Sequence, residues 1–310
     1  MIATPQPEPT ILFGLGANKA GSTWLYRYLS RHPDCRMPDV KELHFFDAVT
    51  AARRANERRK VENRRDQLVA QLVKASPIQA VALRERLADL DDWLGVIAQD
   101  QSDDGGYRGY LLRRAQGSRL IGDITPAYAL LPEAELARMQ AMGPSVRFLY
   151  ILRDPIDRLW SNIRMNAQRH LGMDAGRAHN APDMAEAVAQ KALRIFDTWA
   201  EGGEAPVNHR SDYMGTLTRL TQAVLPSNLR VMFYETMFNK AAIDRLCGFL
   251  GIAPHPAAID KPVNAGGGHR PGHAPPASGA RITCPSVRIC APDDGRRAIA
   301  LAHEYGGVVR

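Results

Sequence analysis

The segment from Ile11 to Leu25 constrains the fold most, because an apolar run there breaks into a glycine-rich turn and then resumes as an amphipathic stretch. The turn contains Gly16, Lys19 and Gly21, and Ser22 follows directly. This pattern predicts a buried strand, a loop and a helix that begins near Ser22. Main-chain N–H groups at a helix start lack partners within the helix, and the helix dipole and the lysine add positive charge. The segment therefore predicts an anion-binding turn.

The position of the lysine separates this turn from the usual nucleoside-triphosphate loop, whose pattern is G-x-x-x-x-G-K-[ST]. Gly16 and Gly21 keep the spacing of the two glycines, but Ser22 follows the second glycine directly and Lys19 lies inside the loop. An ammonium group placed there approaches a phosphate from a different side. ATP hydrolysis is therefore not the first expectation, although a P-loop kinase or nucleotide hydrolase is kept as an alternative.

Four segments, in the same order along the chain, resemble the sulfotransferases that use 3′-phosphoadenosine-5′-phosphosulfate (PAPS). Residues 11–25 resemble their 5′-phosphosulfate loop, and residues 146–161 resemble their 3′-phosphate motif, a strand that ends in arginine before a helix that carries serine. Residues 41–47, Lys-Glu-Leu-His-Phe-Phe-Asp, resemble a segment of glycan-type and many bacterial members, and residues 229–252 resemble their late strand and helix. The resemblance implies transfer of a sulfuryl group from PAPS to a hydroxyl or amine acceptor, with release of 3′-phosphoadenosine-5′-phosphate (PAP).

The resemblance places the nucleotide between two phosphate sites. Lys19 would stabilise the charge that grows on the bridging oxygen, since sulfuryl transfer, like phosphoryl transfer, depends on positioning and charge stabilisation. Arg153, at the end of a parallel strand, and Ser161 on the next helix would hold the 3′-phosphate, which distinguishes PAPS from ATP. The residues expected to bind the 5′-phosphate beside Lys19 are Ala20, Gly21, Ser22, Thr23 and Trp24.

Glu42 is the expected general base, because a carboxylate can take the acceptor's proton where burial or neighbours raise its pKa. His44 is the rival, since the small-molecule members of the family generally use a histidine. The two residues stand two positions apart, so on an extended segment both side chains would lie on one side. His44 is therefore expected to act in catalysis, to bind the acceptor or to fill the core, and these alternatives stay open.

The sequence departs from the family at residues 124–128, Ile-Thr-Pro-Ala-Tyr, where many members carry a lysine in a Lys-Ser/Thr-Pro-x-Tyr turn. Lys19 is then the clear catalytic cation. Asp123 and Tyr128 are interpreted as turn residues, with a place in the acceptor pocket as the alternative. In the family a late basic loop closes over the nucleotide, so Arg270, in the glycine- and proline-rich loop at about 261–280, is a candidate cofactor-binding residue; an ordinary surface loop is the other interpretation.

Alternation of short apolar strands with helices predicts a P-loop-like three-layer α/β/α fold with a central, mostly parallel sheet. Strands are expected at residues 119–124 and 146–152, and Asp154 with Pro155 predicts the start of a helix. Helices are expected at 50–74, 77–99 and 107–116, as an insertion over about 50–116. The chain has 310 residues, 45% of them hydrophobic, which is enough for a large core, so a single sulfotransferase domain over residues 1–310 is expected.

The formal net charge of +7 favours anionic partners but does not choose among nucleotides, sulfated glycans, nucleic acids and membranes. Much of the basic excess lies at residues 53–65, where interspersed acidic residues are typical of an exposed helical face; contact with an acceptor or polyanion is the alternative. No nucleic-acid-binding motif accompanies it, and nucleic acid is not expected as a partner.

The four cysteines lack metal-binding spacing, so no metal site is expected, and free thiols are favoured over a disulfide between Cys284 and Cys290.

No apolar run approaches the roughly 20 residues that a membrane-spanning helix needs, and the N-terminus does not resemble a signal peptide. A cytoplasmic protein without a transmembrane segment is therefore expected. The sequence leaves the acceptor open among carbohydrates, lipids and secondary metabolites. A non-catalytic protein that binds PAP or another polyanion is the third possible function.

Overall fold

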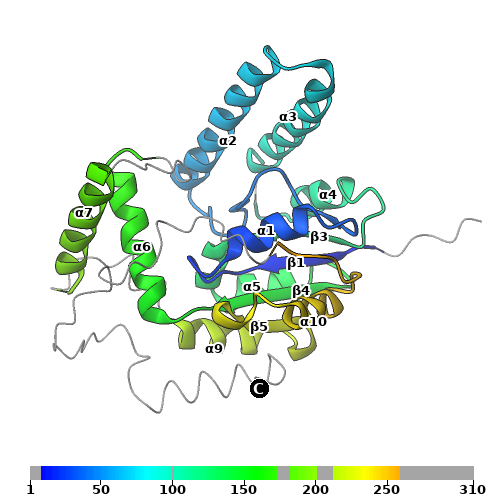
Figure 1. Cartoon of the computed structure of the whole chain (residues 1–310). Coiled ribbons are helices and arrows are strands. Elements are labelled where there is room, and N and C mark those ends of the chain that lie inside the picture. The colour runs from blue at the N-terminus through cyan, green and yellow to red at the C-terminus, as the bar shows by residue number, and fades with distance from the viewer. Residues whose placement is uncertain (1–7, 100, 174–181, 201–211, 259–310) are drawn as a thin grey trace, which may run out of the picture.

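A computed structural model describes residues 8–99, 101–173, 182–200 and 212–258 (Figure 1). The expectations for Arg270, for Cys284 and Cys290 and for the loop at about 261–280 lie outside these residues. The described strands form a five-stranded sheet in the order β2-β3-β1-β4-β5, with every neighbouring pair parallel. The strands are β1 Thr10–Gly14, β2 Cys35–Arg36, β3 Leu120–Ile124, β4 Val146–Leu152 and β5 Leu229–Phe233.

Helices connect the strands and cover both faces of the sheet (Figure 1). Short 3-10 turns cover Pro126–Leu130, Pro226–Asn228 and Tyr234–Thr236. The helices are α1 Ser22–Ser30, α2 Ala51–Leu72, α3 Pro77–Ile97, α4 Gly105–Arg113, α5 Glu133–Gln140, α6 Pro155–His170, α7 Pro182–Ala200, α9 Tyr213–Ala223 and α10 Lys240–Leu250. The P-loop-like three-layer fold with a parallel sheet and a helical insertion, expected from the sequence, is confirmed.

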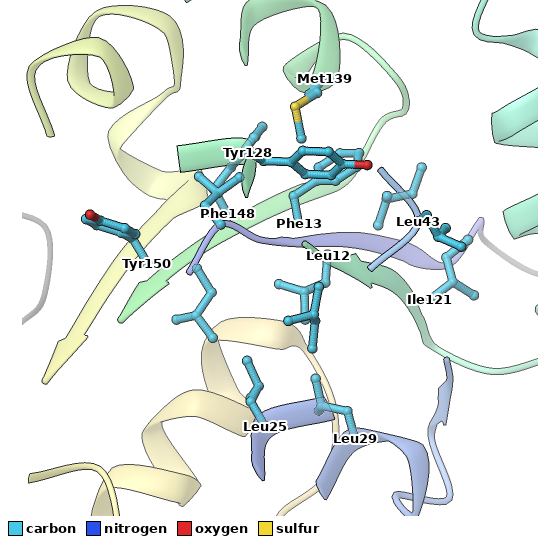
Figure 2. Packing of buried hydrophobic residues seen from close by; sticks show 14 of the residues in the cluster. Leu12, Phe13, Leu25, Leu29, Leu43, Ile121, Tyr128, Met139, Phe148 and Tyr150 are labelled. Carbon is cyan, nitrogen blue, oxygen red and sulfur yellow. The ribbon is translucent and has the colours of Figure 1, made fainter. Parts of the chain in front are cut away.

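The alternation of side chains along β1 builds the two core layers. Leu12 points towards Leu25 and Leu29 of α1, whereas Phe13 lies on the other face, beside Phe148 of β4 (Figure 2). All five side chains are almost completely buried. Because successive side chains of a strand point to opposite faces, an unbroken apolar run can bury a strand on both sides, as parallel sheets require.

The helical insertion lies between β2 and β3 and comprises α2, α3 and α4. Helices α2 and α3 form an antiparallel hairpin that stands out from the layers (Figure 1). Ser76 caps α3 in a capping box with Gln79, and Pro77 occupies the first turn, which explains the predicted break there. Helix α4 begins two residues earlier than the expected 107–116. It also ends three residues earlier, and the left-handed backbone conformations of Gln116 and Gly117 do not allow a helix to continue to 116.

Helices α6 and α7 form a second packed pair with its own apolar cluster. Leu159 and Ile163 of α6 pack with Ala192 and Trp199 of α7. Asp154 starts α6 by accepting hydrogen bonds from the main-chain N–H groups of Ile156 and Asp157, each at 2.9 Å, as its N-cap position predicts. Helix α7 was not predicted from the sequence.

Among the described residues, no helix combines the length and apolar composition that crossing a lipid bilayer requires.

Candidate active site

The carboxyl ends of β1, β3, β4 and β5 meet at one edge of the sheet, because all four strands are parallel. This edge is where α/β proteins bind ligands. The loop after β1 is tied to β4: the Leu15 N–H donates to the Leu149 carbonyl at 2.9 Å, and the Ala17 N–H donates to the Ile151 carbonyl at 2.7 Å. The predicted anion-binding turn is therefore held by the main chain of the neighbouring strand.

The turn ends at Gly21, which precedes α1 in a left-handed conformation with φ of 91°. A Cβ at Gly21 would lie 3.2 Å from the Tyr234 ring, so both the backbone conformation and the close ring favour glycine there. No side chain caps α1, and within the described part of the chain the N–H groups of Ser22 and Thr23 have no acceptor. These N–H groups and the helix dipole make the start of α1 able to bind an anion, as predicted.

The Trp24 side chain packs in the core and stabilises the fold. Its ring stacks on Tyr28 and meets Phe238 edge-on, and its Nε1–H donates to the Ala258 carbonyl at 3.1 Å. The indole is buried. Only the main chain of Trp24 is then left for the nucleotide role predicted for this residue.

Lys19 lies in a strongly positive environment. Its Nζ is 3.8 Å from the Met165 sulfur of α6, and this is its only polar side-chain contact within the described residues. Burial and the charges of Arg169, Arg153 and other nearby cations, Lys41 and Arg164 among them, lower the pKa of Lys19. A partly buried ammonium group among cations is unfavourable by itself, and an anion in the turn would relieve both the desolvation and the repulsion.

Arg153 follows β4 and reaches back to the loop. Its Nη1–H donates to the Lys19 carbonyl at 3.0 Å, and its guanidinium lies 4.6 Å from the Tyr234 ring centre. The carboxylate of Asp157 is 3.9 Å from Nη2, so this ion pair includes no hydrogen bond. The buried Nε of Arg153 has no hydrogen-bond partner within the described structure. Ser161 lies partly exposed on α6, and no hydrogen bond joins it to Arg153 within the described residues.

The segment that carries Glu42 and His44 is not extended, contrary to expectation. Both residues have positive φ, 66° and 56°. Their side chains nevertheless meet, with His44 Nε2 at 3.7 Å from Glu42 Oε2. Lys41 pairs with the other oxygen of Glu42, and His44 Nδ1 lies 3.0 Å from the Asp47 carboxylate. Two carboxylates therefore hold the imidazole between them.

This arrangement changes the expected protonation states. Burial alone would raise the pKa of Glu42, but the contact with His44 and the charge of Lys41 outweigh it and lower the pKa to about 2. Burial would lower the pKa of His44, but Asp47 and Glu42 raise it to about 9. The raised carboxylate pKa that was expected for a base is therefore wrong for this conformation. At neutral pH Glu42 is a carboxylate and His44 is an imidazolium.

A buried polar network fixes this segment to the sheet. Asp123, at the end of β3, accepts hydrogen bonds from the Tyr107 and Tyr128 hydroxyls at 3.0 and 2.7 Å and from the Thr125 hydroxyl at 2.6 Å. It also faces the Leu43 N–H at 3.4 Å, while the Tyr128 hydroxyl accepts from the Phe45 N–H at 3.0 Å.

Asp123 and Tyr128 are almost completely buried. Burial raises the pKa of Asp123, and the four donor groups oppose that shift. The interpretation of both residues as structural fits this burial, and the alternative of a place in the acceptor pocket does not. Their contacts join the turn after β3 to the segment that carries Glu42 and His44.

Sequence reasoning missed several residues around Lys19 and Arg153. Tyr234, directly after β5, contacts both the guanidinium of Arg153 and Gly21. Its position after a parallel strand was the available signal, because that position places it at the ligand edge of the sheet. Met165, Arg164 and Arg169 come from α6, and no local pattern ties them to a loop so distant in sequence.

The chain belongs to the sulfotransferase family, because the profile described as "Sulfotransferase family" matches residues 9–256. The protein is therefore a transferase of the class that moves sulfuryl groups. No curated protein sequence matches the chain.

The chain is also similar to the following solved structures. A crystal structure of a sulfotransferase from Alicyclobacillus acidocaldarius is 19% identical, with 85% of this chain and 88% of that chain covered and a TM-score of 0.47. The sulfotransferase domain of the Synechococcus PCC 7002 olefin synthase is 16% identical, with 99% and 90% covered and a TM-score of 0.44. The sulfotransferase domain from the curacin biosynthetic pathway is 17% identical, with 87% and 83% covered and a TM-score of 0.39.

Proposed function

We propose that the protein transfers a sulfuryl group from PAPS to a hydroxyl or amine of a carbohydrate or small-molecule acceptor and releases PAP. The observation that carries the proposal is the position of Lys19. Lys19 belongs to the anion-binding turn, and its ammonium group is partly buried beside α6, among other cations and without a carboxylate partner in the described residues. A donor with phosphate groups at both ends would neutralise this charge and that of Arg153.

The residues fit such a nucleotide at both ends. The free N–H groups of Ser22 and Thr23 suit a 5′-phosphate, and the side chain of Lys19 suits the bridging oxygen. Arg153, with an unpaired buried Nε, suits a second phosphate. Ser161 on α6 and Arg270, outside the described residues, are proposed as further ligands of the nucleotide.

The protonation states favour Glu42 over His44 as the base. The reaction needs a group that takes the acceptor's proton while the acceptor oxygen or nitrogen bonds to sulfur and the bond from sulfur to the bridging oxygen breaks. With a pKa of about 9, the His44 imidazole is already protonated at neutral pH and cannot take that proton. Glu42 is ionised and is therefore the one of the two that can accept it, although the contacts with His44 and Lys41 that lower its pKa to about 2 make it a weak base. His44 then orients Glu42 and balances its charge, and Lys19 stabilises the leaving bisphosphate.

A P-loop kinase is the weaker alternative. Such an enzyme needs an aspartate that reaches Mg²⁺ beside the phosphate loop. Asp123 is the penultimate residue of the neighbouring strand β3, but it is 1% exposed and surrounded by four hydrogen-bond donors. Its carboxylate therefore has a structural role in the core and is not available to bind Mg²⁺. A non-catalytic PAP-binding protein does not explain why Glu42 and His44 are held together next to Lys41, whose charge acts on Lys19.

The test is bisphosphate release. Purified protein is incubated with PAPS and pools of carbohydrate and small-molecule acceptors, with and without EDTA, and PAP is quantified. The proposal expects PAP formation that depends on an acceptor and survives EDTA. Tight PAP binding without turnover on any pool would support the non-catalytic alternative, and turnover of ATP that requires Mg²⁺ would support the kinase.

A further inference from the structure

The hairpin of α2 and α3 carries a polar groove that no step of the proposed reaction uses. The groove has a volume of about 440 Å³, and Leu68 forms part of its lining. The polar lining consists of Lys60, Asn63, Arg64, Gln67 and Gln71 of α2 and Arg86 of α3. Cations and amides thus face one hollow, and no carboxylate lines it among the described residues.

The groove follows one face of α2. Positions 60, 63, 64, 67 and 71 recur at the three- and four-residue spacing of a single helical face. Glu62 and Asp66 fall on the opposite face, where Glu62 pairs with Arg58 at 3.1 Å. Arg65, at the other edge of the hairpin, pairs with Asp91 at 2.5 Å. The carboxylates of α2 are therefore mostly turned away from the groove.

The cations of the groove are available to a ligand. Arg64 is exposed and has no ion pair within the described residues. Lys60 pairs with Glu57 at 2.8 Å and Arg86 pairs with Asp39 at 3.2 Å, but the Lys60 side chain is 60% exposed and that of Arg86 36%. The Arg86 pair is partly exposed and contributes little, about 0–1 kcal/mol, so an anionic ligand can compete with it. Glu57 is buried, and Lys60 can bind a ligand through its remaining N–H while it stays paired with Glu57.

The same face of α2 leads back to the candidate active site. Arg53, two helical turns before Lys60, lies on this face and pairs with Asp47, which also holds His44. At 1.5 Å per residue, the groove begins about 10 Å from Arg53 and its last member, Gln71, lies about 27 Å away. An extended molecule along α2 can therefore place one end beside Glu42.

We propose that this groove binds an acceptor that is an acidic oligosaccharide, with its anionic groups on Lys60, Arg64 and Arg86 and its hydroxyl groups on the amides of Asn63, Gln67 and Gln71. The inference rests on the proposed sulfotransferase function and names the class of its acceptor. Amides donate and accept hydrogen bonds, as hydroxyl-rich ligands require, and the three cations supply the complement to negative charge.

Two other anionic partners fit the groove less well. Its lining contains no aromatic side chain on which nucleic-acid bases could stack. The exposed apolar residues Val69 and Val73 lie near the tip of the hairpin, on the face of α2 away from the groove. A membrane that covered these valines would leave the groove uncovered. Ile78 and Val81 of α3 are also exposed near this tip, and binding to vesicles tests whether they draw a membrane to the groove.

The test compares two variants with the same net charge. In the groove variant, Lys60→Gln, Arg64→Gln and Arg86→Gln are combined. In the control variant, Arg58→Gln, Arg59→Gln and Arg84→Gln remove three cations of the same hairpin that do not line the groove. Binding of fluorescent oligogalacturonate, neutral dextran oligomers, poly-glutamate and phosphatidylserine vesicles is measured at 0.15 M salt without nucleotide. Circular dichroism and the affinity for PAP check that both variants are folded.

We expect oligogalacturonate to bind at least about tenfold more tightly than dextran or poly-glutamate, a difference of about 1.4 kcal/mol. The groove variant should lose at least tenfold in this affinity, while the control stays within about threefold of the wild type. Equal losses of oligogalacturonate affinity in both variants would overturn the proposal. It would also be overturned if poly-glutamate or the vesicles bound as tightly as oligogalacturonate and if that binding depended on the groove residues. If oligogalacturonate binds through the groove residues but no acceptor leads to PAP release, the groove would be supported as a binding site and the sulfotransferase function would be rejected.

Discussion

Arg153 donates a hydrogen bond to the main-chain carbonyl of Lys19 across 3.0 Å, so the strand end that carries the arginine also holds the loop that carries the lysine. The two proposed phosphate sites are thereby fixed relative to each other. A nucleotide with phosphates at both ends meets a preformed spacing and pays little to order it. This relationship makes the discrimination between PAP and 5′-AMP the most direct measurement on the site.

Arg153→Gln should weaken PAP binding by about 10- to 100-fold, because a hydrogen bond to a charged group contributes about 1.5–3 kcal/mol. The affinity for 5′-AMP should change less, since that nucleotide lacks the 3′-phosphate. Calorimetry with both nucleotides decides the matter, with Arg113→Gln, an exposed arginine at the end of α4, as the control. Equal losses for PAP and 5′-AMP would mean that Arg153 acts only by holding the loop.

Lys19→Ala should lower kcat by about 10²–10³-fold and weaken PAP binding by a smaller factor, because its charge matters most when the bridging oxygen becomes negative. Steady-state kinetics and direct PAP binding on the same protein separate the two effects. Lys74→Ala, at the exposed turn between α2 and α3, removes a lysine without touching the site. A change in the KM for PAPS alone would make Lys19 an anchor and not the catalytic cation.

Glu42→Gln keeps the shape of the side chain but removes its ability to take a proton. We expect turnover to fall by about 10²–10⁴-fold while the affinity for PAP is retained. His44→Gln should cost less, because the imidazole is already charged at neutral pH. Glu62→Gln on the far face of α2 serves as the control. A nearly active Glu42→Gln together with an inactive, folded His44→Gln would transfer the role of base to the histidine.

The pH dependence of stability reports on the His44 contacts. Its pKa in the folded protein is about 9, above the ordinary 6.5, so the protonated imidazole stabilises the fold fully below pH 6.5. That contribution is lost as the pH rises from 6.5 through 9. The difference in unfolding free energy between wild type and His44→Gln, measured with urea at several pH values, should shrink over this window. Asp47→Asn should move the upper end of the window down, and a difference that grew with pH would contradict the assignment.

Asp123 can be tested as a positioning residue in two graded steps. Tyr107→Phe removes one of its four donors and should cost about 1 kcal/mol of unfolding free energy. Asp123→Asn replaces an acceptor-only group by an amide whose N–H₂ faces donors, and should cost about 1–3 kcal/mol. Both variants should bind PAP as the wild type does, while kcat falls in the order of the stability losses. Reduced PAP affinity with unchanged kcat would show that the network supports the nucleotide loop instead.

Sequence alone predicted the parts of the molecule that local chemistry determines. The turn around Lys19, the apolar strand before Arg153 and the capped start of α6 each carry their signal within a few neighbouring residues. Parallel pairing of the strands, which the sequence also predicted, then places Lys19 and Arg153 at the same edge of the sheet.

The left-handed conformations of Glu42 and His44 carry no such local signal. They coincide with hydrogen bonds from their segment to Asp123 and Tyr128, about eighty residues later. The lowered pKa of Glu42 follows from this geometry and could not be predicted from a carboxylate beside a lysine. The positions of the α6 cations near Lys19 could not be predicted from the sequence either, since only the folded chain brings them together.

The hairpin of α2 and α3 leaves the sheet after β2, an edge strand of two residues that pairs only with β3. Adding or removing a matched turn in both helices would thus leave the register of β1 with β3 and β4 unchanged. Each added turn would carry the outer end of the groove about 5.4 Å further from Glu42. If the groove binds an acidic acceptor as proposed, the length of the hairpin would set the distance between the bound negative charge and the group that is modified, and chains with hairpins of different length would modify the same polymer at different intervals.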